Sequence, residues 1–564
     1  MIKNLNIIDF KGISNLYELF ILQLKKNPQK NFLFSKVEGT WKGKSFQDLN
    51  IAISRIQSFF FKKKIKKGDR IMLLCSNRIE WFIADMAIMS CGGVTVPCFS
   101  TNNESDNNYI INDCNPKFVI LENLNIYERN KKILKNIIPK ILLIENNDNF
   151  NSFENIIKTK EKNKLFKLLK IKKSELSSII YTSGTSGKPK GVMLSHENIL
   201  HNIEAAQDLL SNFKLGNEKF LSFLPLSHSY ERMAGLYFPL SIGAEIHYCK
   251  SLENITNDFK EVNPTIITAV PRLYENIYKK IMIKINQSSR LSKYFFSKAL
   301  ESNQERKTVF AFLLNLVLDI TVRKKIRKIF GRNLKTFISG GAALEPKIGD
   351  FFIKMGCQIL QGYGQTEASP LISCNTVKNN KTSTVGVPVK NVKIRIANDN
   401  EILVKGKNIM LGYWNNSKLT KKTIKQGWLH TGDLGSIDEK NRVIISGRKK
   451  DLIVTSGGEN ISSQKIENLL ISNKEIIQAV IYGDKKPYLV ALIVPQKNVT
   501  HNKIKLIISK TNSNLNTNEK IRKFLIIKKE MSYEDGFLTQ TLKIKKKNVF
   551  KHFESELDKL YQIL

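Results

Sequence analysis

Eleven consecutive residues in the first half of the chain have the composition of a phosphate-binding loop. The segment YTSGTSGKPKG at residues 181–191 contains three glycines, four serine or threonine hydroxyls and two lysines. Glycines let backbone amides approach a ligand closely, and hydroxyl and ammonium groups donate hydrogen bonds to phosphate oxygens. The segment therefore predicts nucleotide chemistry, although a run of glycine, serine and threonine also fits a solvent-exposed turn.

The P-loop ATPases are the first class of protein to compare with this loop, and the spacing excludes them. A P-loop places four residues between its first glycine and a Gly-Lys-Ser/Thr triplet, whereas only two residues separate Gly184 from Gly187. Lys188 is followed by Pro189, so the hydroxyl that would bind magnesium in a P-loop is missing. A nucleotide-binding role for this loop therefore requires an architecture other than the P-loop, and the remaining motifs decide between that role and a turn.

Four further motifs follow the loop in order. They are QGYGQTE at residues 361–367, WLHTGD at 428–433, GRKKD at 447–451 and SGGEN at 456–460. Together with the loop, they closely resemble the motifs of the adenylate-forming superfamily, which includes acyl-CoA synthetases, luciferases and the adenylation domains of peptide synthetases. The resemblance covers nearly the whole chain, up to Lys543, and is nearest to the long-chain acyl-CoA synthetases.

This resemblance implies a two-step ligase. A carboxylate does not react with a thiol at neutral pH because its leaving group would be oxide, whereas an acyl adenylate releases AMP. The expected enzyme binds a medium- or long-chain fatty acid, ATP and Mg²⁺, and releases pyrophosphate. It then transfers the acyl group to CoA.

The resemblance also implies roles for residues around ATP. Thr366 is expected to contact the α-phosphate, and Tyr363 to stack on adenine. Glu367 and Thr185 are the expected Mg²⁺ ligands, because this hard cation prefers oxygen. The loop residues expected to bind the β- and γ-phosphates are Thr182, Ser183, Gly184, Thr185, Ser186, Gly187 and Lys190.

Three charged residues complete the expected nucleotide site. Asp433 should accept hydrogen bonds from the ribose hydroxyls, a common role for an acidic residue at a nucleoside site. Arg448 should assist at the ribose and phosphate. Lys543 is the leading catalytic candidate, because its ammonium group can bridge the carboxylate and α-phosphate oxygens while negative charge accumulates there.

The second half-reaction requires a different arrangement of the same chain. In this family a small C-terminal domain rotates between adenylation and thioester formation, and Lys450 is the expected pivot. Gly457 and Gly458 should then let the backbone approach the pantetheine arm of CoA, although they also fit a hairpin turn.

The acyl substrate is expected to bind beside two further segments. His228 matches a family histidine next to the acyl and thiol tunnel, and it joins Lys543, Thr366 and Glu367 as a catalytic candidate. The small residues Gly340, Gly341 and Ala342 should form a pocket wall that leaves room for a chain. The alternative for His228 is a purely structural histidine.

Alternating apolar and helical segments predict the α/β scaffold that must position these residues. Strands are expected at 70–75, 93–96, 118–121 and 176–181, and helices at 47–63, 80–89 and from 195 onwards, as in a helix-covered parallel sheet. A more β-rich part should follow residue 392. The resemblance implies an N-terminal AMP-binding domain at 1–446 and a small, mobile α+β C-terminal domain at 447–564.

Composition limits the remaining choices. A chain of 564 residues is too long for a single hydrophobic core, so two or more domains are expected. The seven cysteines include no Cys-x-x-Cys pair, which favours reduced thiols in the cytoplasm. The net charge of +40 is spread along the chain, which favours compositional bias over a specific nucleic-acid site. Residues 275–335 carry positive charge more densely, with fifteen Lys or Arg against four Asp or Glu. This pattern favours helices whose apolar face packs on the core and whose basic face is solvated, and the alternative is a basic amphipathic surface at the inner face of an anionic membrane.

Two alternatives remain at this point. An acyl carrier protein could replace CoA as the acceptor, because the same adenylate serves both thiols. The chain could also be a membrane- or nucleic-acid-binding protein with vestigial synthetase motifs, although intact Glu367, Asp433, Arg448 and Lys543 argue against it.

Overall fold

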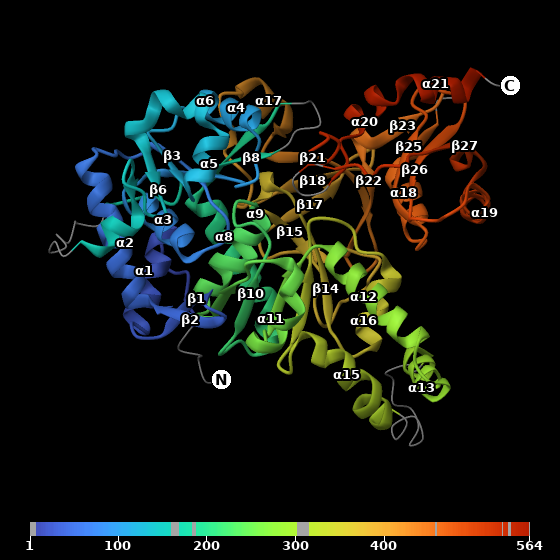
Figure 1. Cartoon of the computed structure of the whole chain (residues 1–564), viewed down its shortest axis with the longest axis horizontal. Helices are drawn as coiled ribbons and strands as arrows, with labels where there is room; N and C mark the ends of the chain where they lie inside the picture. Colours follow the sequence, from blue (N-terminus) through green and yellow to red (C-terminus); the bar gives the residue numbers. More distant parts are fainter. Residues whose placement is uncertain are drawn as a thin grey trace.

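The computed structural model describes residues 7–159, 169–182, 188–301, 315–456, 459–532, 534–539 and 543–562. Its described part is an α/β protein with two large mixed sheets, a smaller β-rich sheet and a compact C-terminal group of helices and strands. Figure 1 shows that C-terminal group, in orange and red, at one end of the molecule. The predicted fold class is therefore confirmed.

The first large sheet carries the glycine-rich loop. Its strand order is β19-β9-β8-β4-β3-β5-β6-β7, and its inner strands are short apolar runs that are buried on both faces. The strands are β3 (Arg70–Leu74), β4 (Val94–Cys98), β5 (Phe118–Leu121), β6 (Ile141–Leu143), β7 (Asn151–Ser152), β8 (Leu176–Thr182), β9 (Lys190–Ser195) and β19 (Gly412–Tyr413).

The second large sheet has the order β16-β15-β14-β13-β12-β10-β11-β1-β2, with a parallel centre between β11 and β14. Its edge strands pair antiparallel. The strands are β1 (Asn31–Val37), β2 (Thr40–Ser45), β10 (Lys219–Ser222), β11 (Glu245–Tyr248), β12 (Ile266–Ala269), β13 (Thr336–Ser339), β14 (Ile359–Gly364), β15 (Leu371–Cys374) and β16 (Val387–Pro388).

Helices with one apolar face cover these sheets. In α2, a capping box between Ser45 and Asp48 satisfies free backbone amides at the helix start, and Leu49, Ile53 and Ile56 are buried at helical spacing. The longer helices of this part are α1 (Leu16–Lys26), α2 (Phe46–Lys62), α3 (Ile79–Ser90), α4 (Glu104–Cys114), α8 (His196–Leu210), α11 (Ile255–Val262), α12 (Pro271–Asn286), α13 (Arg290–Glu301) and α16 (Pro346–Lys354).

The β-rich part and the C-terminal elements complete the fold. The five-stranded sheet contains β17 (Lys393–Ile396), β18 (Glu401–Lys405), β20 (Ile424–Lys425), β21 (Trp428–Ile437) and β22 (Val443–Arg448). The C-terminal elements include β23 (Leu452–Val454), β24 (Asn460–Ser462), β25 (Ile476–Tyr482), β26 (Leu489–Pro495), β27 (Ile521–Ile526), α18 (Ser463–Ile471), α19 (His501–Asn512), α20 (Lys546–His552) and α21 (Glu554–Gln562). The division at residue 447 stays a prediction.

All seven cysteines are unpaired and buried. Burial raises the pKa of each thiol well above its ordinary value. It reaches about 12 for Cys91, Cys114, Cys249, Cys357 and Cys374, and Cys75 and Cys98 also lie well above 9. Within the described ranges, no helix has both the length and the apolar character needed to cross a membrane.

Candidate active site

The glycine-rich loop closes a β-hairpin. Thr182 at the end of β8 pairs directly with Lys190 at the start of β9, so both predicted phosphate ligands stand at the base of the loop. Ser183, Gly184, Thr185, Ser186 and Gly187 lie outside the described residues. The sequence reasoning missed β9, because it placed a helix after the loop without an intervening strand. That helix does start as expected, with Ser195 capping α8.

Two hydrogen bonds to Asp113 fix the base of this hairpin. The hydroxyl of Tyr181, the residue before Thr182, donates a hydrogen bond of 2.5 Å to Asp113 Oδ2. The indole nitrogen of Trp414 donates to the Asp113 backbone oxygen at 3.0 Å. These contacts join the loop to α4 and to the segment after β19, which orients Thr182 and Lys190.

Most predicted site residues meet in one cavity. Its volume is about 610 Å³. The predicted residues that line it are Thr182, Lys190, His228, Gly340, Gly341, Tyr363, Thr366, Glu367, Arg448, Lys450 and Lys543. A second, wider cleft of about 2090 Å³ adjoins it and adds Ala342 and Asp433 to the set. Gly457 and Gly458 lie outside the described residues, so their expected place beside CoA stays a prediction.

Asp433 is the centre of a buried polar network. The β21–β22 register places it directly opposite Arg448, whose Nε donates to Asp433 Oδ1 at 2.9 Å. The Tyr363 hydroxyl donates to Asp433 Oδ2 at 2.6 Å. Burial raises the pKa of Tyr363, and the Asp433 charge raises it further. The network orients a carboxylate and a guanidinium group at the edge of the cavity, where hydroxyl and phosphate groups could bind.

Tyr413 contacts both Glu367 and Lys190. The Tyr413 hydroxyl donates to Glu367 Oε1 at 2.9 Å, and Lys190 Nζ lies 5.6 Å from the centre of the Tyr413 ring. The other Glu367 oxygen accepts no hydrogen bond from a described residue, so it could bind a cation. Thr366 is held by a 3.1 Å hydrogen bond between its hydroxyl and that of Ser229.

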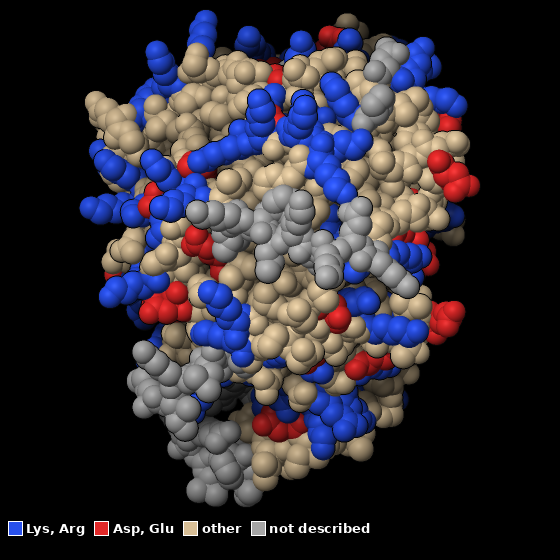
Figure 2. All heavy atoms as spheres, turned by 90° about the vertical axis from the view of Figure 1, so that its left-hand side faces the viewer, with Lys and Arg blue, Asp and Glu red and all other residues tan. Residues whose placement is uncertain are grey.

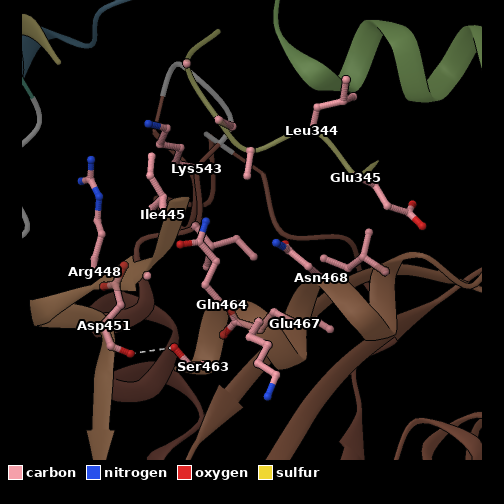
Figure 3. Close-up of a pocket in the computed structure, with 18 of the residues that line it drawn as sticks. Leu344, Glu345, Ile445, Arg448, Asp451, Ser463, Gln464, Glu467, Asn468 and Lys543 are labelled. Atoms are coloured by element: carbon pink, nitrogen blue, oxygen red, sulfur yellow. Dashed lines mark hydrogen bonds between the residues drawn. The ribbon is translucent and has the colours of Figure 1, made fainter. Parts of the chain in front are cut away.

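Lys543 extends into the same region from the C-terminal elements. Its backbone amide donates to Thr539 Oγ1, and its carbonyl accepts from the Thr539 amide. Figure 3 shows Lys543 and Arg448 extending toward the same part of the pocket. Surrounding protein lowers the pKa of Lys543, and nearby Arg448 lowers it further. The lining of the cavity thus combines several basic residues with the carboxylate of Glu367.

The expected pivot lies in a short connection directly after β22. Lys450 is the middle residue of a 3₁₀ turn, Lys449–Asp451. On one side, Lys449 forms ion pairs with Asp399 and Glu401 in the β17–β18 hairpin. On the other side, the Asp451 carbonyl accepts from the Ser463 hydroxyl at 2.8 Å, a bond drawn in Figure 3. The turn is therefore bonded to different elements at its two ends.

The small residues after β13 have a clear packing reason. A side chain at Gly340 would lie 3.0 Å from the Tyr230 ring, and Gly341 has a φ of +82°, which disfavours larger residues. The cavity continues past this wall into an apolar region that the sequence analysis did not identify. Its apolar lining includes Leu209, Leu210, Phe220, Met233, Phe238, Ile266 and Ile338.

His228 begins a helical turn, and its Nδ1 accepts from the Tyr230 amide at 3.3 Å. Burial lowers its pKa to about 4, and Lys543 adds to this effect. The histidine is therefore neutral near pH 7. This protonation state suits a hydrogen-bonding or steric role beside the cavity.

The lowered pKa predicts acid sensitivity. Between pH 6.5 and about 4 the unfolded chain binds a proton at His228 that the folded chain does not, so stability falls as the pH drops. His228→Asn keeps a capping side chain and removes this titration. Denaturant unfolding at pH 7.5 and 5.0 should show a smaller acid-induced loss for the variant. An equal loss in both proteins would contradict the assignment.

Comparison with known proteins places this site in a family. The model of the AMP-binding enzyme family matches residues 20–414, and the model of the AMP-binding enzyme C-terminal domain matches residues 450–564. The chain therefore belongs to the AMP-binding enzyme family.

Two curated relatives and one solved structure resemble this chain over most of its length. The chain is 29% identical to the long-chain-fatty-acid–CoA ligase FadD15 of Mycobacterium bovis, with 88% of each chain covered. It is 27% identical to a chloroplastic long-chain-fatty-acid–[acyl-carrier-protein] ligase of Arabidopsis thaliana, over 88% of this chain and 80% of that one. The adenylation domain of a Mycobacterium chelonae carboxylate reductase has the same fold, with a TM-score of 0.77, 18% identity and coverage of 99% and 94%.

Proposed function

We propose that this protein is an ATP-dependent, AMP-forming ligase that activates a medium- or long-chain fatty acid and transfers the acyl group to CoA. One observation carries the proposal: a single cavity joins the polar residues Lys190, Glu367 and Lys543 to an apolar region lined by Phe220 and Phe238. An adenylating enzyme must hold a carboxylate beside the α-phosphate. A fatty acid additionally needs an apolar wall for its hydrocarbon chain.

In the first half-reaction, a carboxylate oxygen attacks the α-phosphorus of ATP. The bond from that phosphorus to the bridging oxygen breaks, and pyrophosphate leaves. Lys190 would donate to the departing phosphates, and its position at the base of the loop and in the cavity lining supports this role. Lys543 would stabilise charge on the carboxylate and α-phosphate oxygens, and Asp433 would hold the ribose.

Mg²⁺ fits the same arrangement. Glu367 offers a carboxylate oxygen without a hydrogen-bond donor among the described residues, and the Thr185 hydroxyl is the second proposed ligand. When bound, the cation would neutralise phosphate charge. Glu367 is also oriented by Tyr413, so its position does not depend on the metal.

In the second half-reaction, the CoA thiolate attacks the acyl carbonyl carbon and AMP leaves. We assign residues 1–446 and 447–564 to two domains that rotate about Lys450 between the steps. The different bonding of Lys449 and Asp451 supports this pivot, because each end of the turn is tied to other elements. Gly457 and Gly458 are proposed to contact the pantetheine arm.

The experiment is a pyrophosphate-release assay over acids of graded chain length. With CoA present, acids of medium to long chain should give pyrophosphate, AMP and acyl-CoA in equal amounts. Acetate should be inactive, because it cannot fill the apolar region. Formation of ADP, or equal rates with acetate, would contradict the proposal.

An acyl carrier protein is the second candidate acceptor. The basic chain, with a net charge of +40, would suit an acidic carrier, and one relative acts with such a protein by name. The same assay with CoA and carrier protein in separate reactions distinguishes the two acceptors. We further propose that the protein works in the cytoplasm and contacts the inner face of an anionic membrane, where long-chain acids partition.

A further inference from the structure

A group of exposed apolar side chains lies at the outer end of α12, on α13 and in the segment after residue 315. We call residues 283–301 and 315–328 the helical tip. Figure 1 shows α13 and α15 (Lys324–Arg327) at the lower right extremity of the molecule. The exposed apolar residues of the tip are Ile283 (56% exposed), Leu291 (65%), Tyr294 (58%), Leu316 (50%), Val317 (43%) and Ile320 (60%).

The inner side of the tip is anchored in the core, so this exposure is not a sign of poor packing. Phe296 and Ala299 on α13 are buried, and the Phe296 ring lies 6.2 Å from that of Phe351 in α16. Leu318 and Ile326 are buried in the same hydrophobic cluster. The tip therefore has one face that stabilises the fold and another face whose apolar side chains contact water.

Cationic side chains surround the exposed apolar residues. Lys284, Arg290 and Lys293 are exposed on the α12–α13 side, and Lys324, Lys325 and Lys328 are exposed on the other side. The Lys298 ammonium lies 5.9 Å from the centre of the Tyr294 ring. Apolar side chains flanked by cations match a surface in which hydrocarbon lies directly beneath anionic groups.

Positive charge alone does not distinguish the helical tip from the rest of the surface. Figure 2 shows Lys and Arg spread widely over the face that is the left-hand side of Figure 1, away from α13. Those cations provide a general attraction to any anion. The concentration of exposed aliphatic side chains distinguishes the tip, because aliphatic side chains gain free energy from hydrocarbon and little from a polynucleotide.

The tip is connected to the active site through α12. One side of this helix, with Tyr278, Lys279, Met282 and Ile283 at helical spacing, lines the cleft that also contains Arg448 and Lys543. Figure 3 shows this helix above the pocket, next to Leu344 and Glu345. A lipid surface held at the tip would therefore lie beside the mouth of the active-site cleft.

We propose that the helical tip docks on anionic lipid, inserting Leu291, Tyr294 and Ile320 among the acyl chains while the neighbouring cations bind headgroups. This inference rests on the proposed function only for its biological purpose, which is to collect an acid that partitions into membranes. Lipid binding itself requires neither ATP, nor acid, nor CoA.

The test measures co-sedimentation of the full chain with vesicles, without substrates. Binding to vesicles of phosphatidylglycerol and phosphatidylcholine should exceed binding to phosphatidylcholine alone, and should weaken between 0.05 and 0.5 M salt. The triple variant Leu291→Ser, Tyr294→Ser, Ile320→Ser should bind at least about tenfold more weakly. The triple variant Lys284→Gln, Arg290→Gln, Lys293→Gln should lose about fivefold for each cation.

Two matched controls use exposed residues elsewhere. Leu124→Ser, Val377→Ser, Leu506→Ser removes three exposed apolar side chains outside the tip, and Lys132→Gln, Lys135→Gln, Lys140→Gln removes three cations. The apolar control should bind vesicles like the unaltered protein, and the cation control should lose less than the tip variant. Equal losses in tip and control variants would overturn the proposal, as would vesicle binding that no variant changes.

The same variants test other partners for the tip. If the serine variant alters the sedimentation velocity of the free protein and not its vesicle binding, the tip is a contact between copies of this chain. If the protein prefers single-stranded polynucleotide to anionic vesicles and the serine variant behaves normally, the basic surface serves nucleic acid. Either result overturns the docking proposal and leaves the ligase proposal intact, because pyrophosphate release from ATP with water-soluble octanoate as the acid is measured separately.

Discussion

Lys543→Ala should slow adenylate formation by about two to three orders of magnitude, which corresponds to about 2.7–4 kcal/mol of transition-state stabilisation for one electrostatic donor. Lys543 reaches the cavity from the C-terminal elements, and its ammonium lies in a protein-lined region with Arg448. Negative charge accumulates there only while the carboxylate attacks the α-phosphorus. ATP binding should therefore change much less than the rate.

The measurement is acid-dependent exchange of labelled pyrophosphate into ATP, which reports the first half-reaction alone. Conversion of supplied acyl-AMP and CoA to acyl-CoA should persist in the variant. Lys551→Ala is the control, because Lys551 is an exposed cation of α20 that lines neither the active-site cavity nor the adjoining cleft. Equal damage to both half-reactions would argue against a role confined to adenylation and against the proposed rotation.

Asp433→Asn should raise the KM for ATP about 10- to 100-fold. The substitution keeps the shape of the side chain and removes its negative charge. In the unaltered protein this carboxylate accepts hydrogen bonds from Arg448 and Tyr363. A hydrogen bond to a charged group contributes about 1.5–3 kcal/mol, and the proposed ribose contacts are of this kind. The loss should therefore appear mainly in nucleotide binding.

Deoxynucleotides give this prediction a specific readout. The unaltered enzyme should discriminate against 2′-deoxy-ATP and 3′-deoxy-ATP, and Asp433→Asn should lose most of that discrimination. Asp438→Asn is the control, because Asp438 lies in the same β21–β22 hairpin and pairs with Arg442 away from the cavity. A variant that still rejects the deoxynucleotides would show that Asp433 does not bind the ribose.

The sequence predicted the scaffold well where local pattern determines structure. Strand 118–121 and the start of α8 at Ser195 agree with the structure, because a buried apolar run and a capping residue act locally. The strand β9 was missed, since its short apolar segment directly follows the glycine-rich loop and derives its strand character from pairing with β8. Pairing between distant segments leaves little mark on local composition.

The same distinction applies to the site. Motif residues such as Asp433 and Arg448 were predicted, and the β21–β22 register brings them into contact. Tyr413 was not predicted, although it holds Glu367 and faces Lys190, because its role depends on β19 pairing with β9 across more than two hundred residues. The apolar lining of the cavity also comes from several elements, none of which is distinctive alone.

The burial of all seven cysteines has a chemical consequence for an enzyme of this kind. An acyl adenylate is a mixed anhydride, and any accessible thiolate could capture its acyl group before the proper acceptor arrives. Here all seven protein thiols are buried and burial raises their pKa, so protonated sulfur predominates near pH 7 even in Cys98 and Cys374, which line the cleft and the cavity of the active site. Capture of the acyl group by a cysteine of the protein is therefore disfavoured, as is a mixed disulfide between such a cysteine and the incoming thiol.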